Sequence, residues 1–386
     1  NTGYCSIHPS SDDAPLANCR LWDDEDIKVH ALMVDAVHRH GALAGVELWH
    51  GGSGTSNRFS RVPLMSVSGV SSDSTYPGWI NLTRSRPMDK HDIREFRRWH
   101  VDAAKRAKSA GFDIVYIYAG MNFGPYQFLL PRMNKRTDEY GGTLENRVRL
   151  MREIVEDMKE AVGQTCAIAL RFSTDELLKI PGQTMESEAH EIISMLSDLP
   201  DLWDLKSSSW VTETASARFS EQGSQEPWVS FAKPLTSRPV VGVGRFTSPD
   251  AMVSQIKRGI LDLIGAARPS IADPFLPKKI DEGREDEIRE CIGCNICVSS
   301  YHDCVPVRCT QNPTMGEEWR RNWHPERIPP GDPEQSVLIV GAGPAGLECA
   351  RALGQRGFAV TVAEARAELG GRVTIESRLP GLASWA

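Results

Sequence analysis

The sequence lacks the features that would place a protein in a membrane or on a secretory route. No uninterrupted apolar run approaches the length needed to cross a bilayer, so we expect no membrane partner. The first residues, 1–5, include no initiator Met, no basic region and no apolar region, and therefore resemble neither a signal peptide nor a natural N-terminus. We expect a cytoplasmic protein whose sequence is cut short at its start.

An excess of positive charge is also missing. The formal charge is −7, from 44 Lys and Arg against 51 Asp and Glu, and no basic cluster is interleaved with aromatic residues. A nucleic-acid surface would need both features, so we expect no nucleic-acid partner. The length of 386 residues exceeds what one hydrophobic core usually organises, which predicts one large domain and part of a second.

Cysteine is concentrated in one short segment. Five of the nine cysteines fall within 19 positions, namely Cys291, Cys294, Cys297, Cys304 and Cys309. The first three, followed by Cys309, have the spacing C-x2-C-x2-C-x11-C, which is typical of a [4Fe–4S] cluster. We prefer Cys309 to Cys304 as fourth ligand, because the longer gap leaves a loop that can return to the cluster. A structural zinc site, or reduced cysteines in a core, remain alternatives, although zinc sites favour two separated C-x2-C pairs.

Short β-rich runs alternate with amphipathic helical stretches from residue 42 to residue 269. This pattern predicts an α/β fold of repeated βα units, a (β/α)8 TIM barrel. The expected strands are 44–49, 113–118, 167–172, 202–207, 240–245 and 263–268, with residues 2–6 as the tail of another, and the clearest helices are 93–110 and 144–162. About seven strands result, so the first barrel strand would precede Asn1. We expect a barrel domain over 1–285, a cluster segment and linker over 286–334, and a truncated domain over 335–386.

That last domain begins with a dinucleotide-binding motif. A strand at 336–340 leads into Gly341, Gly343 and Gly346 in a G-x-G-x-x-G pattern, which is followed by a helix. Such glycines let the backbone approach a pyrophosphate at a helix N-terminus, and Glu364 at the next strand end could accept a hydrogen bond from a ribose hydroxyl. A Gly-rich turn without function is the alternative. The acid favours FAD or ADP over a ligand with a 2′-phosphate.

Charged residues at barrel strand ends predict a second nucleotide, FMN. Gly244, Arg245 and Arg268 close the last two expected strands, where barrels commonly bind phosphate. Arg171 could offset negative charge on a reduced isoalloxazine, and Glu47 could bond its pyrimidine edge. Isolated charges of this kind are more often surface residues, but catalytic groups gather at barrel strand ends.

Several longer phrases carry a family resemblance. They are Ala44-Gly-Val-Glu-Leu-Trp49, Asn134-Lys-Arg-Thr-Asp-Glu-Tyr-Gly-Gly142, Leu144-Glu-Asn-Arg147, Gly265-Ala-Ala-Arg-Pro-Ser-Ile-Ala-Asp-Pro274 and the segment that begins Cys309-Thr-Gln-Asn312. Nearly the whole chain resembles the trimethylamine dehydrogenase group, with its dimethylamine and histamine dehydrogenases, of the old yellow enzyme superfamily. The resemblance implies an FMN barrel, a [4Fe–4S] cluster and oxidative N-demethylation of a methylated amine, with transfer of hydride to FMN. It also implies electron transfer through the cluster to an electron-transfer flavoprotein, and we expect a homodimer.

The resemblance also assigns site residues. An aromatic substrate bowl corresponds to Tyr4, Trp210 and Tyr301, the last replacing a Trp of the family. Such rings attract an alkylammonium by about 0.5–2 kcal/mol each. Aromatic residues in a core are the alternative interpretation.

The family's Tyr–His–acid group corresponds to Tyr118, Met121 and Glu213. Methionine cannot carry a proton, so a base role would fall to Tyr118 or a neighbour, and the substrate is expected to differ from trimethylamine. The cysteine that attaches FMN covalently in the family would precede Asn1.

A related reductase activity is the main rival hypothesis. Dienoyl-CoA and enoate reductases share the barrel, the cluster and the nucleotide domain, but take electrons from a nicotinamide. They need paired donors at the flavin, which Met121-Asn122 does not provide, and the aromatic bowl suits a cation better. Among amines, small methylamines, N-methyl amino acids and histamine-type amines all remain open, and an inactive fragment is also possible.

Overall fold

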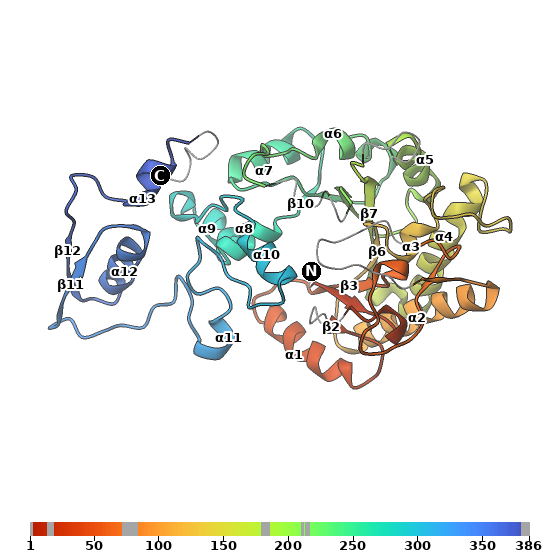
Figure 1. Cartoon of the computed structure of the whole chain (residues 1–386), viewed down its shortest axis with the longest axis horizontal. Helices are drawn as coiled ribbons and strands as arrows, with labels where there is room; N and C mark the ends of the chain where they lie inside the picture. The colour runs from red at the N-terminus through yellow and green to blue at the C-terminus, as the bar shows by residue number, and fades with distance from the viewer. Residues whose placement is uncertain are drawn as a thin grey trace. The chain divides into compact units, whose positions relative to one another are not determined.

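The computed structural model describes residues 3–13, 19–71, 84–178, 186–209, 212 and 217–379. These residues belong to two compact units, which we describe one at a time (Figure 1). The first unit takes in residues 1–215, 223–244 and 252–265, and the second takes in 216–222, 245–251 and 266–386.

A parallel sheet forms the centre of the first unit. Its eight strands among the described residues run in the order β10-β9-β8-β7-β6-β3-β1-β2, and each neighbouring pair is parallel. The strands are β1 Tyr4–Ser6, β2 Cys19–Arg20, β3 Gly45–Trp49, β6 Ile114–Ala119, β7 Ala167–Asp175, β8 Leu202–Ser207, β9 Val240–Gly242 and β10 Leu263–Ile264. Apart from the two-residue β2, strands consecutive in the chain lie side by side, as the repeated βα units of a barrel require. The α/β barrel class expected from the sequence is confirmed.

The last two expected strands are too long. β9 ends at Gly242 and β10 at Ile264, and helix α8 occupies Ala267–Ala272. Pro269 lacks a backbone N–H and therefore fits the first turn of a helix better than a paired strand. At the other strand end, Arg245 has φ +60°, a left-handed conformation that interrupts an extended chain. Arg268 therefore lies in a helix, not at a strand end.

Helices flank the strands of the sheet in Figure 1. They are α1 Asp26–His38, α2 Lys90–Ser109, α3 Gly124–Gln127, α4 Leu144–Val162, α5 Glu186–Leu196, α6 Glu226–Val229 and α7 Pro249–Lys257. The expected helix 144–162 has the bounds of α4, because Thr143 caps it by accepting a hydrogen bond from Asn146 N. α2 starts three residues before its expected start, at a capping box in which Asp89 and Asp92 each accept from the other's backbone N–H.

Short elements complete the first unit. A two-stranded parallel pair joins β4 Met65–Ser66 to β5 Arg86–Pro87, and 3-10 turns occupy Pro9–Ser11, Gly52–Gly54, Gly163–Thr165 and Lys233–Leu235. The core of the sheet is strongly buried. All six residues of β8 are buried, as are all five of β3. Side chains on these strands alternate between the inner face and the helix layer, so residues two apart share a face.

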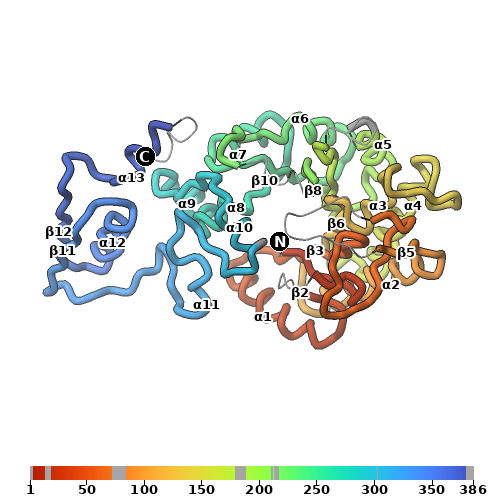
Figure 2. Tube along the Cα trace, viewed as in Figure 1, coloured from red at the N-terminus to blue at the C-terminus, as the bar shows by residue number. Residues whose placement is uncertain are grey.

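The second unit contains the cysteine segment and a βαβ unit. Its elements are α8, α9 Leu276–Asp281, a 3-10 turn at Glu285–Glu287, α10 Ile296–His302, α11 Glu318–Arg321, β11 Ser336–Val340, α12 Pro344–Gln355, β12 Ala359–Ala363 and α13 Arg372–Glu376. Figure 2 follows the chain from β11 through α12 to β12, and the two strands pair in parallel over five residues. The expected strand–glycine–helix order is therefore confirmed as the start of a Rossmann-like domain.

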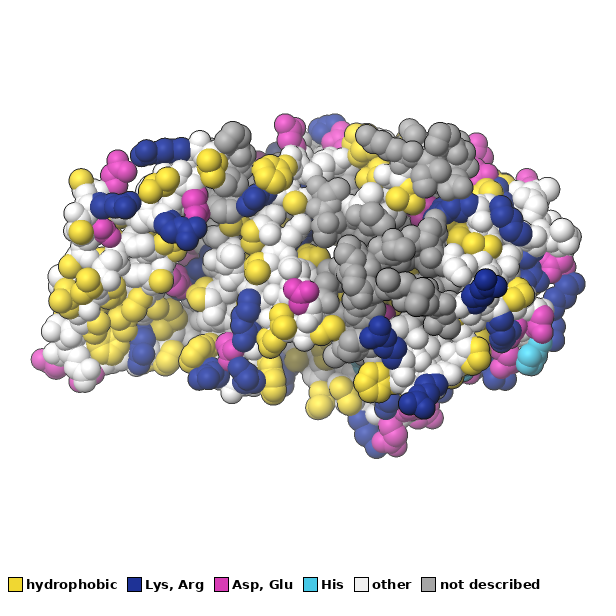
Figure 3. Space-filling view, viewed as in Figure 1, with side chains coloured by type: hydrophobic (Ala, Val, Ile, Leu, Met, Phe, Trp, Pro, Cys, Tyr) yellow, Lys and Arg dark blue, Asp and Glu magenta, His cyan; other side chains and the backbone are white. Residues whose placement is uncertain are grey.

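This βαβ unit carries apolar side chains on its surface. Figure 3 shows hydrophobic side chains gathered at the β11–β12 end of the chain. Leu338 and Val340 of β11 are 64% and 84% exposed, unlike the fully buried strands β3 and β8. One helix can cover only one face of a two-stranded sheet, and the alternation of β11 puts Leu338 and Val340 on the other face. Among the described residues, no helix combines the length and the apolar composition that spanning a bilayer would require.

Candidate functional site

A three-residue ion network lies on the inner face of the barrel. Arg171 Nη1 on β7 donates to Glu47 Oε1 on β3 at 3.1 Å and to Asp204 Oδ2 on β8 at 2.8 Å. β6 lies between β3 and β7 in the sheet, so these side chains can meet only across the curved inner face. The side chains of Glu47, Arg171 and Asp204 are 8%, 21% and 6% exposed. The network holds the guanidinium of Arg171 in one orientation.

The inner face continues with further polar groups that the sequence analysis missed. Tyr116 lies two residues before Tyr118 on β6, and burial, followed by the Asp204 and Glu47 carboxylates, raises its pKa to about 12. Lys206 lies two residues after Asp204 on the fully buried β8, on the same face, and is 3% exposed. Strand alternation, applied to Asp204 and Lys206, could have found both charges.

An aromatic cluster adjoins the network. It consists of Tyr4, Trp49, Tyr118 and Phe123, with Met121 packed among them. The guanidinium carbon of Arg171 lies 5.4 Å from the centre of the Tyr118 ring, a cation–π contact. Tyr4 lies 4.8 Å from Trp49 and 6.4 Å from Tyr118, measured between ring centres. Trp49 and Phe123 were not expected here, although Trp49 shares its strand face with Glu47.

The expected catalytic group is only partly described. Tyr118 Oη donates to Met121 Sδ at 3.1 Å, so the hydroxyl and the thioether are in direct contact. Trp210 and Glu213 lie outside the described residues. Tyr301 belongs to α10 of the second unit. The structure therefore brings together Tyr4, Tyr118, Met121, Arg171 and Glu47 from the sequence-based list.

The residues expected to bind a flavin phosphate have fitting chemistry. Gly244 directly precedes Arg245, whose Nε is buried without a hydrogen-bond partner in the described part of the chain. Burial lowers the pKa of Arg245, and so does the nearby guanidinium of Arg268, while Cys291 and Glu290 oppose this shift. Two cations held close together, with a donor left over, provide the chemistry that a phosphate dianion would satisfy.

The cysteine segment turns back on itself. Gly293 and Asn295 have φ +67° and +59°, and these left-handed residues separate Cys291, Cys294 and Cys297. An alanine at Gly293 would place its Cβ 2.7 Å from the backbone nitrogen of Arg218, so the turn requires glycine. Asn295 Oδ1 also accepts a hydrogen bond from Arg268 Nη1 at 2.5 Å.

Four of the five clustered thiols lie in one neighbourhood. Burial raises the pKa of Cys291, and the adjacent Cys294 and Cys309 thiols raise it further, while Arg268 lowers it. Cys297 is affected in the same way by Cys291 and Cys294. Among the described residues, no three His, Cys, Asp or Glu side chains converge as the ligands of a single metal ion would. A four-iron cluster separates its ligand sulfurs more widely than one ion does, so the arrangement still fits such a cluster.

The glycine motif of the second unit has the geometry of a nucleotide loop. Gly341 has φ +100°, and a Cβ on Gly346 would lie 1.9 Å from the carbonyl oxygen of Gly341. Gly343 precedes Pro344, the first residue of α12. Glu364 accepts from Ala342 N at 2.8 Å, and this hydrogen bond lowers the pKa of its carboxyl group. A bound ribose would have to share the Glu364 carboxylate with the loop.

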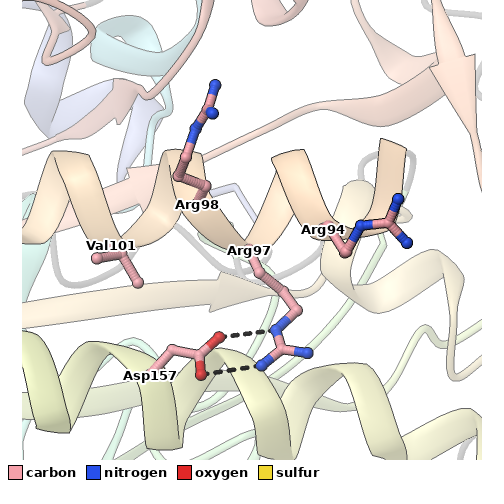
Figure 4. Close-up of a pocket in the computed structure, with 5 residues that line it drawn as sticks. All are labelled: Arg94, Arg97, Arg98, Val101 and Asp157. Carbon is pink, nitrogen blue, oxygen red and sulfur yellow. Dashed lines mark hydrogen bonds and ion pairs between the residues drawn. The ribbon is translucent and has the colours of Figure 1, made fainter. Parts of the chain in front are cut away.

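One further pocket lies on the outside of the barrel. It has a volume of about 320 Å³ between α2 and α4, and it is lined by Arg94, Arg97, Arg98, Val101 and Asp157 (Figure 4). Arg97 turns toward α4 and binds the Asp157 carboxylate with hydrogen bonds of 2.7 and 2.9 Å, while Arg94 and Arg98 point away. These contacts join two outer helices, so the pocket is distinct from the inner-face groups.

The parallel barrel, with charged groups on its inner face and an aromatic cluster beside them, defines a protein of the α/β-barrel class. The chain belongs to the NADH:flavin oxidoreductase / NADH oxidase family, which matches residues 1–287. Residues 339–383 match the NAD(P)-binding Rossmann-like domain.

Individual relatives narrow the comparison. The chain is 44% identical to dimethylamine dehydrogenase of Hyphomicrobium sp. (strain x), over all of this chain and 53% of that protein. It is similar to the structure of a 6-hydroxypseudooxynicotine amine oxidase from Pseudomonas geniculata N1, with 51% identity and a TM-score of 0.94 over 99% of this chain and 57% of that one. It is also similar to the structure of histamine dehydrogenase from Rhizobium sp. 4-9, with 49% identity and a TM-score of 0.93 over 99% of this chain and 55% of that one. The resemblance to the amine dehydrogenase group is confirmed, and the chain spans about half the length of these relatives.

Proposed function

We propose that the protein oxidises an amine at a flavin held in the mouth of the barrel. The observation that carries this proposal is the aromatic cluster beside Arg171 on the inner face. Aromatic faces attract an ammonium or alkylammonium group without requiring a hydrogen bond, and several rings together make a site selective for cations. The relatives named for dimethylamine, histamine and 6-hydroxypseudooxynicotine support the same class of substrate.

FMN is the flavin that these residues would hold. Arg245, Arg268 and the backbone at Gly244 would bind its phosphate, and Glu47 and Arg171 would face its ring system. When bound, FMN supplies the two-electron acceptor for the substrate. Arg171 would place a fixed positive charge where negative charge develops on reduction, and the carboxylates of Glu47 and Asp204 keep this guanidinium from turning away.

The aromatic cluster would position the substrate and exclude water. Tyr118 is 5% exposed and Phe123 is 6% exposed, so a bound amine would lose most of its hydration. Desolvation disfavours the protonated amine, which has no lone pair to assist loss of hydride from the adjacent carbon. Oxidative N-demethylation of a methylated amine is the finer form of this proposal, and Glu213 remains its candidate acid.

The electrons would then leave through iron. Cys291, Cys294, Cys297 and Cys309 would hold a [4Fe–4S] cluster, and Arg268 beside them would favour their thiolate forms. FAD or ADP in the second unit remains a prediction from the glycine motif and Glu364. An electron-transfer flavoprotein as acceptor remains a prediction from the family resemblance, and a homodimer remains an expectation.

Anaerobic mixing of the flavin-loaded protein with one reductant at a time tests the activity. Dimethylamine, sarcosine, histamine and NADH are added separately, and bleaching of the flavin absorbance is followed. We expect at least one amine to bleach the flavin. Bleaching by NADH alone, with turnover of an activated alkene, would replace amine oxidation with the reductase activity.

A further inference from the structure

The segment that follows β1 is held firmly against the end of β3. Ser10 Oγ lies 2.9 Å from Nε2 of His50, and Gly51 N donates to Ser11 Oγ at 2.8 Å. Ser10, Ser11 and His50 are all fully buried. The backbone of residues 8–11 therefore has a defined position at the carboxyl end of the sheet.

Asp12 extends this anchorage by one residue. Its carboxylate accepts from the backbone nitrogens of Phe59 and Ser60 at 2.8 and 2.7 Å. Its own backbone nitrogen donates to Asn57 Oδ1 at 2.8 Å, and Asn57 N donates to the Asp12 carbonyl at 3.0 Å. Four hydrogen bonds fix Asp12, so the position of the next residue, Asp13, is largely set by its neighbour.

Asp13 is placed beside the aromatic cluster. Tyr4 Oη donates to Asp13 Oδ2 at 3.1 Å, and the Tyr4 ring itself packs on Trp49. The hydroxyl is the part of Tyr4 farthest from the strand, so the carboxylate lies at the outer end of that ring. Asp13 is therefore a half-buried acid next to rings that would bind an amine, and the resemblance to the family did not point to it.

The site therefore has two separate polar ends, the Glu47–Arg171–Asp204 network and the Asp13 carboxylate. Arg171 contacts the Tyr118 ring at one end, and Asp13 contacts Tyr4 at the other, with the two tyrosine rings 6.4 Å apart. A carboxylate next to the reacting nitrogen would keep that nitrogen protonated and oppose oxidation. The same carboxylate at the far end of a substrate would bind a second cation or N–H group without this penalty.

From this arrangement we infer that Asp13 is a specificity-determining residue that binds the non-reacting end of the substrate. The substrate class is an amine with a second basic or N–H-donating group a short chain away. This inference rests on the proposed amine oxidation and adds to it the identity of the substrate's other end.

Steady-state kinetics with two substrates of similar shape test the assignment. Histamine carries a basic N–H ring, and 2-phenylethylamine carries an apolar ring on the same chain. For the flavin-loaded protein with Asp13→Asn, we expect kcat/KM for histamine to fall by about tenfold or more through KM, since a hydrogen bond to a charged group contributes on that scale. The value for 2-phenylethylamine should stay within about twofold. Asp13→Glu keeps the charge and should keep the preference for histamine.

An equal loss on both substrates would show that Asp13 only supports the loop, and would overturn the assignment. The unaltered protein gives a second measurement that depends on no variant folding. Its kcat/KM for histamine should exceed that for 2-phenylethylamine by about tenfold, and a ratio near one would overturn the inference. Bleaching by neither amine, nor by any other amine, would instead remove the proposed function itself.

Discussion

The hydroxyl of Tyr118 donates its hydrogen bond to a thioether, Sδ of Met121, at 3.1 Å. Met121 and Asn122 both have positive φ, so the turn after β6 directs the methionine back toward the strand from which it came. A thioether accepts a hydrogen bond weakly and cannot take a proton. Tyr118 is thus positioned by a neighbour that plays no part in proton transfer.

Replacing Met121 with a titratable residue should change the pH dependence of the reaction. Met121→His would put an imidazole beside the Tyr118 hydroxyl, and histidine tolerates positive φ better than most residues. We expect kcat/KM to gain an ionisation near pH 6–7, and Met121→Leu to show none. The measurement is kcat/KM for one amine from pH 5 to 10. Identical pH profiles for the two variants would contradict the placement of residue 121 beside the Tyr118 hydroxyl at the reaction site.

Arg171 should be important for stability as well as for the flavin. Arg171→Met would leave the carboxylates of Glu47 and Asp204 buried without their shared cation, which typically costs about 3–5 kcal/mol. Arg97→Met is the matched control, because it breaks ion pairs that lie between outer helices and should cost about 1 kcal/mol or less. Urea unfolding at pH 7 measures the free energy of unfolding of both variants. An equal decrease in the two variants would show that the inner network stabilises the fold no more than the outer ion pairs do.

The two glycines of α12 should respond in opposite ways to alanine. In Gly346→Ala the new Cβ would lie 1.9 Å from the carbonyl oxygen of Gly341, so the nucleotide loop must shift and ADP binding should be lost. Gly354 has no atom within 4 Å of an added Cβ, and Gly354→Ala should stabilise the helix by about 0.5–1 kcal/mol. Calorimetric titration with ADP measures binding by the two variants. Unchanged ADP binding in Gly346→Ala would argue against this loop as the nucleotide site.

Cys309 and Cys304 should differ in their effect on iron content. Cys309 is near enough to Cys291 to raise the pKa of its thiol, whereas Cys304 is exposed and lies beyond the end of α10. Cys309→Ser should lose most iron and acid-labile sulfide, and Cys304→Ser should retain both. Iron loss in Cys304→Ser alone would show that Cys304, and not Cys309, is the fourth ligand. Zinc in place of iron in the unaltered protein would rule out the iron–sulfur cluster.

His100 should make the fold sensitive to acid. The ring is fully buried, Nδ1 lies 2.8 Å from the Phe96 carbonyl, and burial lowers its pKa to about 4. Between pH 6.5 and 4, His100 is protonated in the unfolded chain but stays neutral in the folded protein. The free energy of unfolding therefore falls as the pH falls, by up to about 1.4 kcal/mol per pH unit. His100→Gln should reduce this slope in urea unfolding, and exposed His91→Gln on the same helix should not. An unchanged slope in His100→Gln would refute this source of acid sensitivity.

The regular elements and their motifs could be predicted because their signals are local. The bounds of α4 follow from Thr143 as cap and from the spacing of apolar residues, and the nucleotide loop follows from three glycines beside a strand and a helix. Strand ends were less predictable. Nothing within 263–268 shows that β10 stops after two residues, because that depends on Pro269 and on the turn that the chain makes there.

By itself the sequence determined the barrel class, the cysteine spacing, the glycine motif and the presence of Glu47, Arg171 and Tyr118 on strands. These properties depend on residues that are close in the chain, where periodicity and spacing act. The tertiary structure alone decided that Arg171 joins Glu47 to Asp204, that Trp49 and Phe123 complete the aromatic cluster, and that Asp13 meets Tyr4. Contacts of this kind depend on how the sheet curves and how a loop is anchored, which many distant residues set together.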